Sequence, residues 1–221
     1  MNTLKCARCG NSLNASDRFC SQCGNECRIV DIDFATPCEN EEVARCLAML
    51  NNMEGLWAVK KEINEIVDFV KMDCVRTQML GYPSRFPRKY LFVGNPCTGR
   101  TTVARLLTDI LYALGVMPEH KMMAVWSKAL IGNSVEKCRS KVRNAVESAL
   151  GGVLFIDDIH LLHDNKNEFA QVTANELTTI LRQHQDDLLC IVAGTPIEIE
   201  ELCVAHPMFR SSFDRELTFE R

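Results

Sequence analysis

The feature that most constrains the fold is an alternation of short apolar runs with amphipathic stretches beyond residue 41. Strands are predicted at the short runs Tyr90–Val93, Lys121–Trp126, Val153–Ile156, Leu188–Val192 and Glu216–Phe219. Helices are predicted at Leu56–Val70 (stopped by Gly81-Tyr82-Pro83), about Thr101–Leu114, Val135–Leu150 and Phe169–Gln185. Because the first four of these runs are largely apolar, so that both faces of each strand are suited to burial, this alternation predicts an α/β fold in which helices cover both sides of a parallel sheet, with Glu216–Phe219 as a last strand.

A glycine-bounded loop joins the first of these strands to the helix that follows. Its residues are Gly94, Asn95, Pro96, Cys97, Thr98, Gly99, Arg100, Thr101 and Thr102. A loop in this position is typical of phosphate binding, because its backbone amides and the positive end of the helix face the anion. The strict pattern G-x-x-x-x-G-K-[ST] fails at Arg100, which stands where the lysine belongs.

Two adjacent carboxylates, Asp157 and Asp158, end the apolar run Val153–Ile156. Such a pair beside a phosphate loop is what Mg²⁺ and an attacking water require. Together the loop and the pair predict a P-loop fold that binds ATP with Mg²⁺. We expect Asp157 to contact the metal and Asp158 to serve in any hydrolysis.

Several segments in the same order resemble the AAA+ ATPases, and most closely the branch of the stage V sporulation protein K and the red-type Rubisco activase. They are Met53-Glu54-Gly55-Leu56, Gly94–Ala104, Gly151–Leu162, Ala193-Gly194 and His206–Phe219. The resemblance covers roughly residues 45 to 221. It implies a five-stranded parallel sheet of order 5-1-4-3-2 and a ring-forming remodelling motor whose site is shared between subunits. It also places a first sensor at Thr195, a residue that could instead only cap the following helix.

The sequence departs from this family's pattern at positions that carry the chemistry. Arg100 replaces the lysine that contacts the β/γ phosphates, and a planar guanidinium is not equivalent to an ammonium. Cys97 stands where the branch usually has glycine, and Asp158 is one methylene shorter than the glutamate that orients water. We therefore expect hydrolysis to be weak or absent, whereas loop amides, Thr101 and Asp157 with Mg²⁺ still permit nucleotide binding.

Further departures concern the parts of a motor that act between subunits. Ser134 occupies the place of the pore-loop aromatic, and Ser212 that of the trans-acting arginine. Arg215 or Arg210 could substitute for that arginine, and with Asp158 we take Arg215 as a candidate catalytic residue. The family's helical lid would follow Arg221, and we expect the core to lack it.

Five of the twelve cysteines fall within the first 27 residues. Four of them form two C-x-x-C-G units, Cys6-Ala7-Arg8-Cys9-Gly10 and Cys20-Ser21-Gln22-Cys23-Gly24, whose thiolates suit a closed structural Zn²⁺ site. The segment resembles the zinc ribbons, and Cys27 is a spare thiol. We predict a zinc ribbon over residues 1–28, a linker over 29–40 and an AAA+-like nucleotide-binding core over 41–221.

Two other patterns have a functional and a plain interpretation. Cys97 lies at a helix N-terminus near Arg100, so its thiolate could be redox-sensitive, although a tolerated small residue is the simpler interpretation. His160 and His163 invite a metal site. Two histidines three positions apart, without a carboxylate partner of known geometry, are more often surface or packing residues.

Composition narrows the function classes. A content of 47% hydrophobic and 24% charged residues is that of a soluble globular chain, and a net charge of −4 argues against nucleic acid as a partner. We find no apolar run of membrane-spanning length and no secretory signal, so we expect a cytoplasmic protein. One hypothesis is an ATP-binding remodelling or chaperone-type subunit that acts on a protein client or beside a homologous AAA+ subunit, in a homo- or hetero-oligomer. The alternative is a non-hydrolysing interaction or regulatory protein that carries a zinc ribbon on a degenerate core.

Overall fold

The computed structural model describes residues 4–5, 12–13, 22, 40–80, 86–162, 167–184 and 186–220. In the first two of these segments, β1 (Leu4–Lys5) pairs antiparallel with β2 (Ser12–Leu13). The four predicted zinc ligands, Cys6, Cys9, Cys20 and Cys23, lie outside the described residues, as do His163 and the predicted linker up to residue 39. The zinc ribbon and the domain division stay predictions.

Five parallel strands form the sheet of the core, as the sequence predicts. They are β3 (Lys89–Gly94), β4 (Met122–Trp126), β5 (Val153–Asp157), β6 (Leu189–Gly194) and β7 (Arg215–Phe219). Their order across the sheet is β4-β5-β6-β3-β7. Numbered along the chain from β3 as the first to β7 as the fifth, this order reads 2-3-4-1-5, which is 5-1-4-3-2 read from the other edge.

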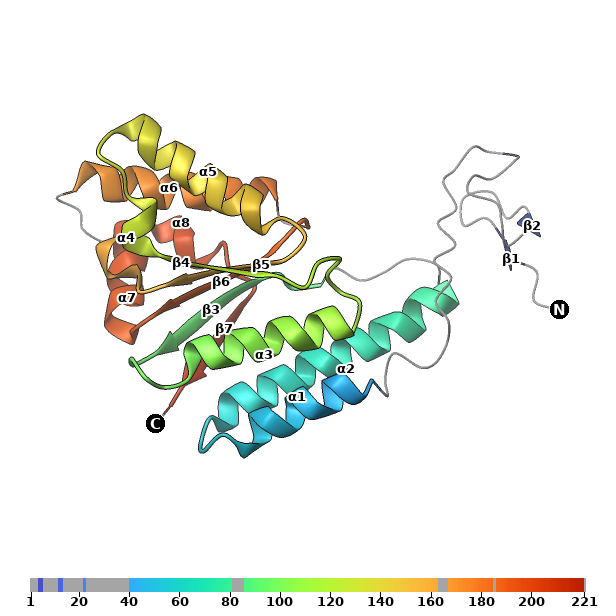
Figure 1. Ribbon diagram of the computed structural model, residues 1–221. Helices are drawn as coiled ribbons and strands as arrows, with labels where there is room; N and C mark the ends of the chain where they lie inside the picture. Colours follow the sequence, from blue (N-terminus) through green and yellow to red (C-terminus); the bar gives the residue numbers. More distant parts are fainter. Residues whose placement is uncertain are drawn as a thin grey trace.

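Helices cover both faces of this sheet (Figure 1). One layer holds α1 (Glu41–Asn52), α2 (Trp57–Leu80) and α3 (Arg100–Ala113). The other holds α4 (Ser127–Leu130), α5 (Val135–Ala149), α6 (Glu168–Gln183), α7 (Pro196–Ala205) and α8 (Pro207–Arg210), with the 3₁₀ turn η2 (Ile159–Leu161) after β5. A hydrophobic core lies between the sheet and each layer of helices, and side chains of β3 alternate between the two. Tyr90 and Phe92 join the core on the side of α1, α2 and α3, and Leu91 and Val93 join the core on the side of α5, α6 and α7.

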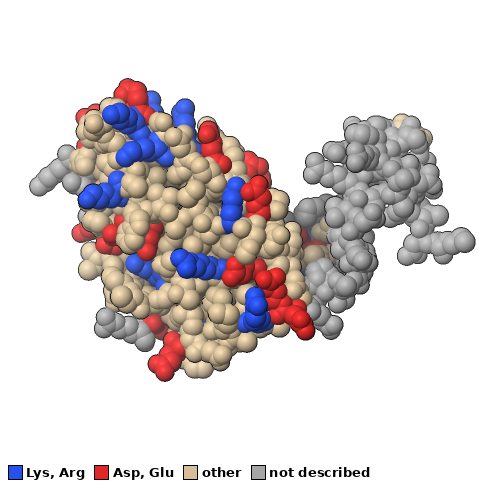
Figure 2. Space-filling model, in the orientation of Figure 1, with Lys and Arg blue, Asp and Glu red and all other residues tan. Residues whose placement is uncertain are grey.

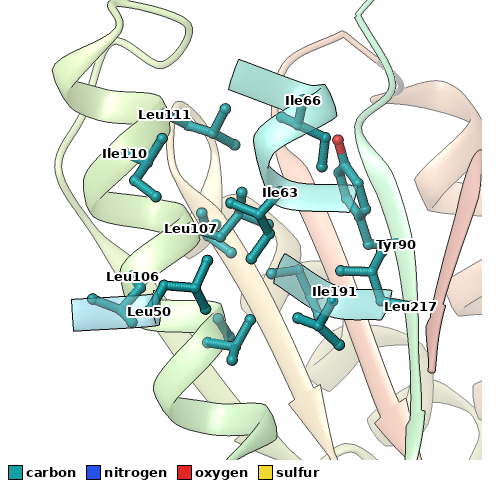
Figure 3. Close-up of a cluster of buried hydrophobic side chains, with 14 of the residues drawn as sticks. Leu50, Ile63, Ile66, Tyr90, Leu106, Leu107, Ile110, Leu111, Ile191 and Leu217 are labelled. Atoms are coloured by element: carbon teal, nitrogen blue, oxygen red, sulfur yellow. The ribbon is translucent and has the colours of Figure 1, made fainter. Parts of the chain in front are cut away.

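The core beneath α3 fixes the helix that begins at the phosphate loop. In Figure 3, Leu107, Ile110 and Leu111 of α3 face Ile63 of α2 and side chains of the sheet such as Ile191. All five are essentially inaccessible to solvent. Because α3 is packed along its length, its first turn has a defined position relative to the carboxyl ends of the strands.

The edge strand β4 departs from the prediction that the apolar runs are buried on both faces. Met123 is 37% exposed and Trp126 is 61% exposed, whereas the residues of β3 and β6 are buried. The reason is topological, because within the described sheet β4 pairs only with β5 and α4 and α5 leave part of it open. Figure 2, in the orientation of Figure 1, shows Lys and Arg side chains interspersed with Asp and Glu over the side of the molecule that faces the viewer.

Within the part of the chain that the structure describes, no helix combines the length and the apolar character needed to cross a bilayer.

We expect Ile110→Ala to lower the free energy of unfolding by about 2–5 kcal/mol, because the side chain is fully buried between α3 and the sheet. The matched control is Ile197→Ala on α7, where the side chain is 69% exposed and the loss should be about 0.5 kcal/mol or less. Urea unfolding followed by circular dichroism measures both. Equal losses in the two variants would contradict the packing of α3 described here.

Candidate functional site

Two glycines set the shape of the loop between β3 and α3. A Cβ on Gly94 would lie 2.5 Å from Cβ of Phe219, so only glycine lets β7 lie this close to the start of the loop. Gly99 has φ +89°, and a Cβ there would lie 2.7 Å from Cε of Met53, in the segment that joins α1 to α2. The loop therefore sits between β7 and the α1–α2 connection, and it follows a strand and opens a helix as predicted.

The first turn of α3 presents backbone amides to this loop. The first N–H of the helix to reach a backbone acceptor is that of Val103, which donates to the carbonyl of Gly99 at 2.9 Å. The amides of Arg100, Thr101 and Thr102 precede it and have no intrahelical acceptor by position. Together with the positive end of the helix dipole, these three donors form a site that suits an anion.

Cys97 keeps the backbone conformation of a glycine. Its φ is +65°, in the left-handed region that side chains rarely adopt, and the residue is exposed. The loop thus retains its shape although a side chain replaces hydrogen at this position, and the strain of that conformation is stored in the loop.

Arg100 turns back into the site. Its Nη1 donates to the carbonyl oxygen of Gly94 at 3.0 Å, and its Nη2 lies 3.3 Å from Oδ1 of Asp157. Only 10% of the Arg100 side chain and 19% of the Asp157 side chain are exposed. The guanidinium therefore links the start of the loop to the end of β5 and neutralises the carboxylate predicted to contact Mg²⁺.

The two carboxylates that end β5 have different partners. Oδ1 of Asp157 accepts a hydrogen bond from the backbone N–H of Asp158 at 3.0 Å, in addition to its contact with Arg100. Asp158 has φ +59° and is the N-cap residue of η2, and its Oδ1 lies 2.6 Å from Nδ1 of His160. Adjacent in sequence, these carboxylates are therefore held by separate basic side chains.

Thr195 follows β6 and caps α7. Its hydroxyl accepts from the backbone N–H of Glu198 at 3.3 Å, and the Glu198 carboxylate accepts from the backbone N–H of Thr195 at 2.8 Å, which completes a capping box. The capping interpretation of Thr195 is thus observed. The residue also borders the cavity described next, where a sensor would stand.

The loop, the carboxylates and Thr195 border one cavity of about 550 Å³. This volume is in the range of small-molecule sites. Its lining comprises Pro96, Cys97, Gly99, Arg100, Thr101, Thr102, Trp126, Asp157, Asp158, Thr195 and Glu198. Of the predicted loop residues, Gly94, Asn95 and Thr98 shape the loop without lining the cavity, and Thr98 does so by donating to the Asn95 carbonyl at 2.8 Å.

Two lining residues, Trp126 and Glu198, were not predicted from the sequence. Trp126 ends β4, and the carboxyl ends of neighbouring parallel strands meet at one edge of a sheet, so its place at the end of an apolar run was a usable signal. Glu198 was signalled by the T-x-x-E spacing from Thr195, which is that of a capping box.

Arg215, the candidate trans-acting arginine, lies away from this cavity. It pairs with Tyr90 at the start of β3, whereas Gly94 pairs with Phe219, so Arg215 is at the opposite end of the sheet from the loop. Its Nη1 lies 2.7 Å from a carboxylate oxygen of Glu62 on α2. The structure does not bring Arg215 and Asp158 together within one chain. The other candidate, Arg210, pairs with Glu216 at 2.6 Å.

Residues 90–221 match the model of the ATPase family associated with various cellular activities (AAA), and the chain belongs to this family. The chloroplastic ribulose bisphosphate carboxylase/oxygenase activase of Cyanidioschyzon merolae is 33% identical over 75% of this chain and 57% of that protein. Protein CbbX of Cereibacter sphaeroides is 32% identical over 75% of this chain and 54% of that protein. The ESX-3 secretion system protein EccA3 of Mycobacterium tuberculosis is 30% identical over 85% of this chain and 31% of that protein.

A solved structure of the FIGL-1 AAA domain in complex with ADP is also similar, with a TM-score of 0.53 and 25% identity over 75% of this chain and 53% of that one. The chain spans between about a third and three fifths of the length of these relatives. The family comparison thus agrees with the P-loop fold and with ATP as the ligand class.

We expect Cys97→Gly to raise the free energy of unfolding by about 0.5–1 kcal/mol, because glycine adopts the left-handed conformation without strain and this gain exceeds its larger unfolded-state entropy. Cys97→Ala is the matched control: it removes the thiol, keeps a Cβ at the same φ, and should leave stability about unchanged. Both are measured by urea unfolding. If Ala stabilises as much as Gly, the effect belongs to the thiol and not to the backbone.

Proposed function

We propose that this chain binds ATP in the cavity between the phosphate loop and the ends of β5 and β6, as an AAA+ remodelling-type subunit whose hydrolysis is weak or absent. The observation that carries the proposal is one cavity bordered by the first turn of α3, Arg100 and Asp157. Donors and a cation on one wall face a carboxylate on another, which is the arrangement that a triphosphate and its metal require.

The residues present fit a bound nucleotide. The amides of Arg100 to Thr102 and the Arg100 guanidinium supply donors to phosphate oxygens, and the Thr101 hydroxyl and Asp157 supply oxygen ligands of the kind Mg²⁺ takes. When bound, Mg²⁺ would neutralise phosphate charge. Because Asp157 is already paired with Arg100, binding of Mg²⁺ and the ion pair compete for the same carboxylate.

Three features support slow turnover. The carboxylate of Asp158 is engaged by His160 at 2.6 Å, and it is one methylene shorter than a glutamate. Arg215, the candidate finger, is held by Glu62 at 2.7 Å at the opposite end of the sheet. An arginine finger contributes about 10³–10⁵ in rate in related phosphoryl-transfer sites, so an Arg215 that stays paired with Glu62 would leave turnover severely slowed.

The proposal also includes an oligomeric assembly of this chain and a protein client on which it acts. A relative named as a ribulose bisphosphate carboxylase/oxygenase activase and another named for a secretion system support a protein client. We keep the branch of the red-type Rubisco activase and the stage V sporulation protein K as a proposal that rests on the motifs of the sequence. We further propose a structural Zn²⁺ held by Cys6, Cys9, Cys20 and Cys23, a homo- or hetero-oligomer, and a cytoplasmic location without nucleic-acid or membrane partners.

A non-hydrolysing interaction or regulatory protein is the second candidate function. The Arg100–Asp157 ion pair favours it, because the pair neutralises the carboxylate of the proposed Mg²⁺ position without nucleotide or metal. The two candidates differ in whether ATP binds and in whether the site can be restored to turnover.

ATP should slow alkylation of Cys97. Among the described cysteines only Cys97 is exposed, and burial raises the pKa of the Cys190 thiol to about 12 and also raises that of Cys46 and Cys203. Iodoacetamide should therefore modify Cys97 first of these, and ATP in the bordering cavity should reduce the rate several-fold. Peptide mass mapping measures the rate, with the half-buried Cys203 as internal reference. A Cys97 rate that millimolar ATP leaves unchanged would refute nucleotide binding.

The double variant Arg100→Lys/Asp158→Glu should release phosphate from Mg·ATP about tenfold faster than the parent chain or more, because it restores an ammonium to the loop and a longer carboxylate to the water position. Arg105→Lys is the control, since Arg105 is exposed on the same helix outside the cavity. Turnover that stays at the parent level while ATP still binds would favour the non-hydrolysing protein.

A further inference from the structure

Three side chains with metal-binding atoms converge beside the cavity, and two of them, Asp158 and Glu198, also line it. The ligand atoms of Asp158, His160 and Glu198 all lie within 4.8 Å of one another. They come from the start of η2 and from the first turn of α7. The proposed nucleotide chemistry uses Asp158 alone and leaves the imidazole and the second carboxylate without a role. We propose that this triad binds one divalent transition-metal ion.

The backbone of Asp158 is fixed where the triad needs it. Its φ of +59° turns the chain sharply out of β5, its N–H donates to Asp157, and its carbonyl accepts from the hydroxyl of Ser127. The turn returns the His160 imidazole to the same side of the chain, so that Nδ1 lies 2.6 Å from Oδ1 of Asp158. Two of the three donors are thus positioned by local backbone geometry.

A close contact in the core brings Glu198 to the same place. A Cβ on Gly194 would lie 2.7 Å from Cγ1 of the fully buried Ile159, so glycine at this position lets η2 lie directly against the end of β6. The chain then enters α7, where Oε2 of Glu198 accepts from the backbone N–H of Thr195 at 2.8 Å. This bond orients the carboxylate and leaves its Oε1 as a possible metal ligand.

The chemistry of the donor set selects the class of metal. One imidazole and two carboxylates suit Mn²⁺, Fe²⁺, Co²⁺ or Zn²⁺, whereas Mg²⁺ prefers oxygen ligands and several waters. With a neutral imidazole the triad carries two negative charges, which a divalent ion balances. Metal–ligand bonds of about 2.1 Å separate two ligand atoms by about 3 Å or a little more, so Asp158 and His160 need to move apart by less than about 1 Å. Their side chains are 39% and 45% exposed, which permits this rotation.

Other histidine–aspartate pairs in the molecule show what is particular to this one. His120 lies 2.7 Å from Asp109, and His184 lies 3.1 Å from Asp187. Within the described residues neither pair has a third metal-binding side chain in reach, whereas the pair of Asp158 and His160 has Glu198. These pairs provide internal controls for a site that needs three ligands.

A metal in the triad would change what Asp158 can do. Ligation to the ion makes the carboxylate less basic and turns it toward the metal, so metal binding would weaken its action on an attacking water and slow any remaining hydrolysis. This consequence rests on the proposed function, but binding of the metal does not, because it requires no nucleotide.

The test is a titration of the full chain with Mn²⁺ in the absence of nucleotide, with free Mn²⁺ measured by electron paramagnetic resonance. We expect one site per chain, with affinity at least tenfold weaker in His160→Ala and in Glu198→Gln. Glutamine preserves the capping box of α7, so the second variant removes charge without removing the cap. All variants share the N-terminal cysteines, and any binding there contributes equally to each.

Control variants make the result decisive. His120→Ala and His184→Ala each remove the histidine of a matched pair and should leave the affinity unchanged. Asp157→Asn, which removes the carboxylate of the proposed Mg²⁺ position, shows whether Mn²⁺ binds there instead. Spin-echo modulation from an imidazole nitrogen on bound Mn²⁺, lost in His160→Ala, identifies the ligand directly. The proposal is overturned if the parent chain shows no site below millimolar Mn²⁺, or if Asp157→Asn abolishes binding while His160→Ala does not.

Discussion

The Arg100 guanidinium is the interaction on which the rest of the site depends, because it connects the carbonyl of Gly94 with the carboxylate of Asp157. This contact joins the start of the loop to the end of β5, across the intervening strand β6. It places a fixed positive charge on the wall of a cavity whose other wall is acidic. In an AAA family member, the same place is where phosphate and metal charges must be balanced. Asp157 is therefore neutralised in the absence of any ligand, and a nucleotide with its metal has to rearrange an existing pair to bind fully.

Much of the core could be predicted from the sequence, because periodicity reports burial directly. The run at Tyr90–Val93 forms β3 and the segment Glu216–Phe219 forms β7, whereas the helix before Gly81 is longer than predicted and reaches Leu80. The error at β4 has a physical cause: a run such as Met122–Trp126 is equally apolar whether it is central or at an edge, and its position depends on strand order. Composition alone does not encode which strand lacks a neighbour.

The site was predictable where chemistry is local and was missed where it depends on the fold. The loop from Gly94 to Thr102 and the pair at Asp157 are contiguous motifs, and they meet in one cavity as the α/β topology requires. The partner of His160 was not recognised, because the contact with Asp158 depends on a left-handed backbone and that with Glu198 on a glycine in another strand. Arg215 was predicted from its place in a segment that resembles the family, whereas its ion pair with Glu62 on α2 is a tertiary contact that the sequence does not reveal.

The open edge at β4 has a practical consequence for spectroscopy. The chain holds only two tryptophans, and one of them, Trp126, is 61% exposed and borders the cavity. The other, Trp57, begins α2, in the opposite layer, with the Lys60 ammonium 5.5 Å from its ring. Because indole emission depends on the polarity and quenching groups around it, a chain in which Trp57 is replaced by phenylalanine would carry a single tryptophan, which borders the cavity and can be excited selectively over the three tyrosines. Occupancy could then be followed optically, without any attached dye.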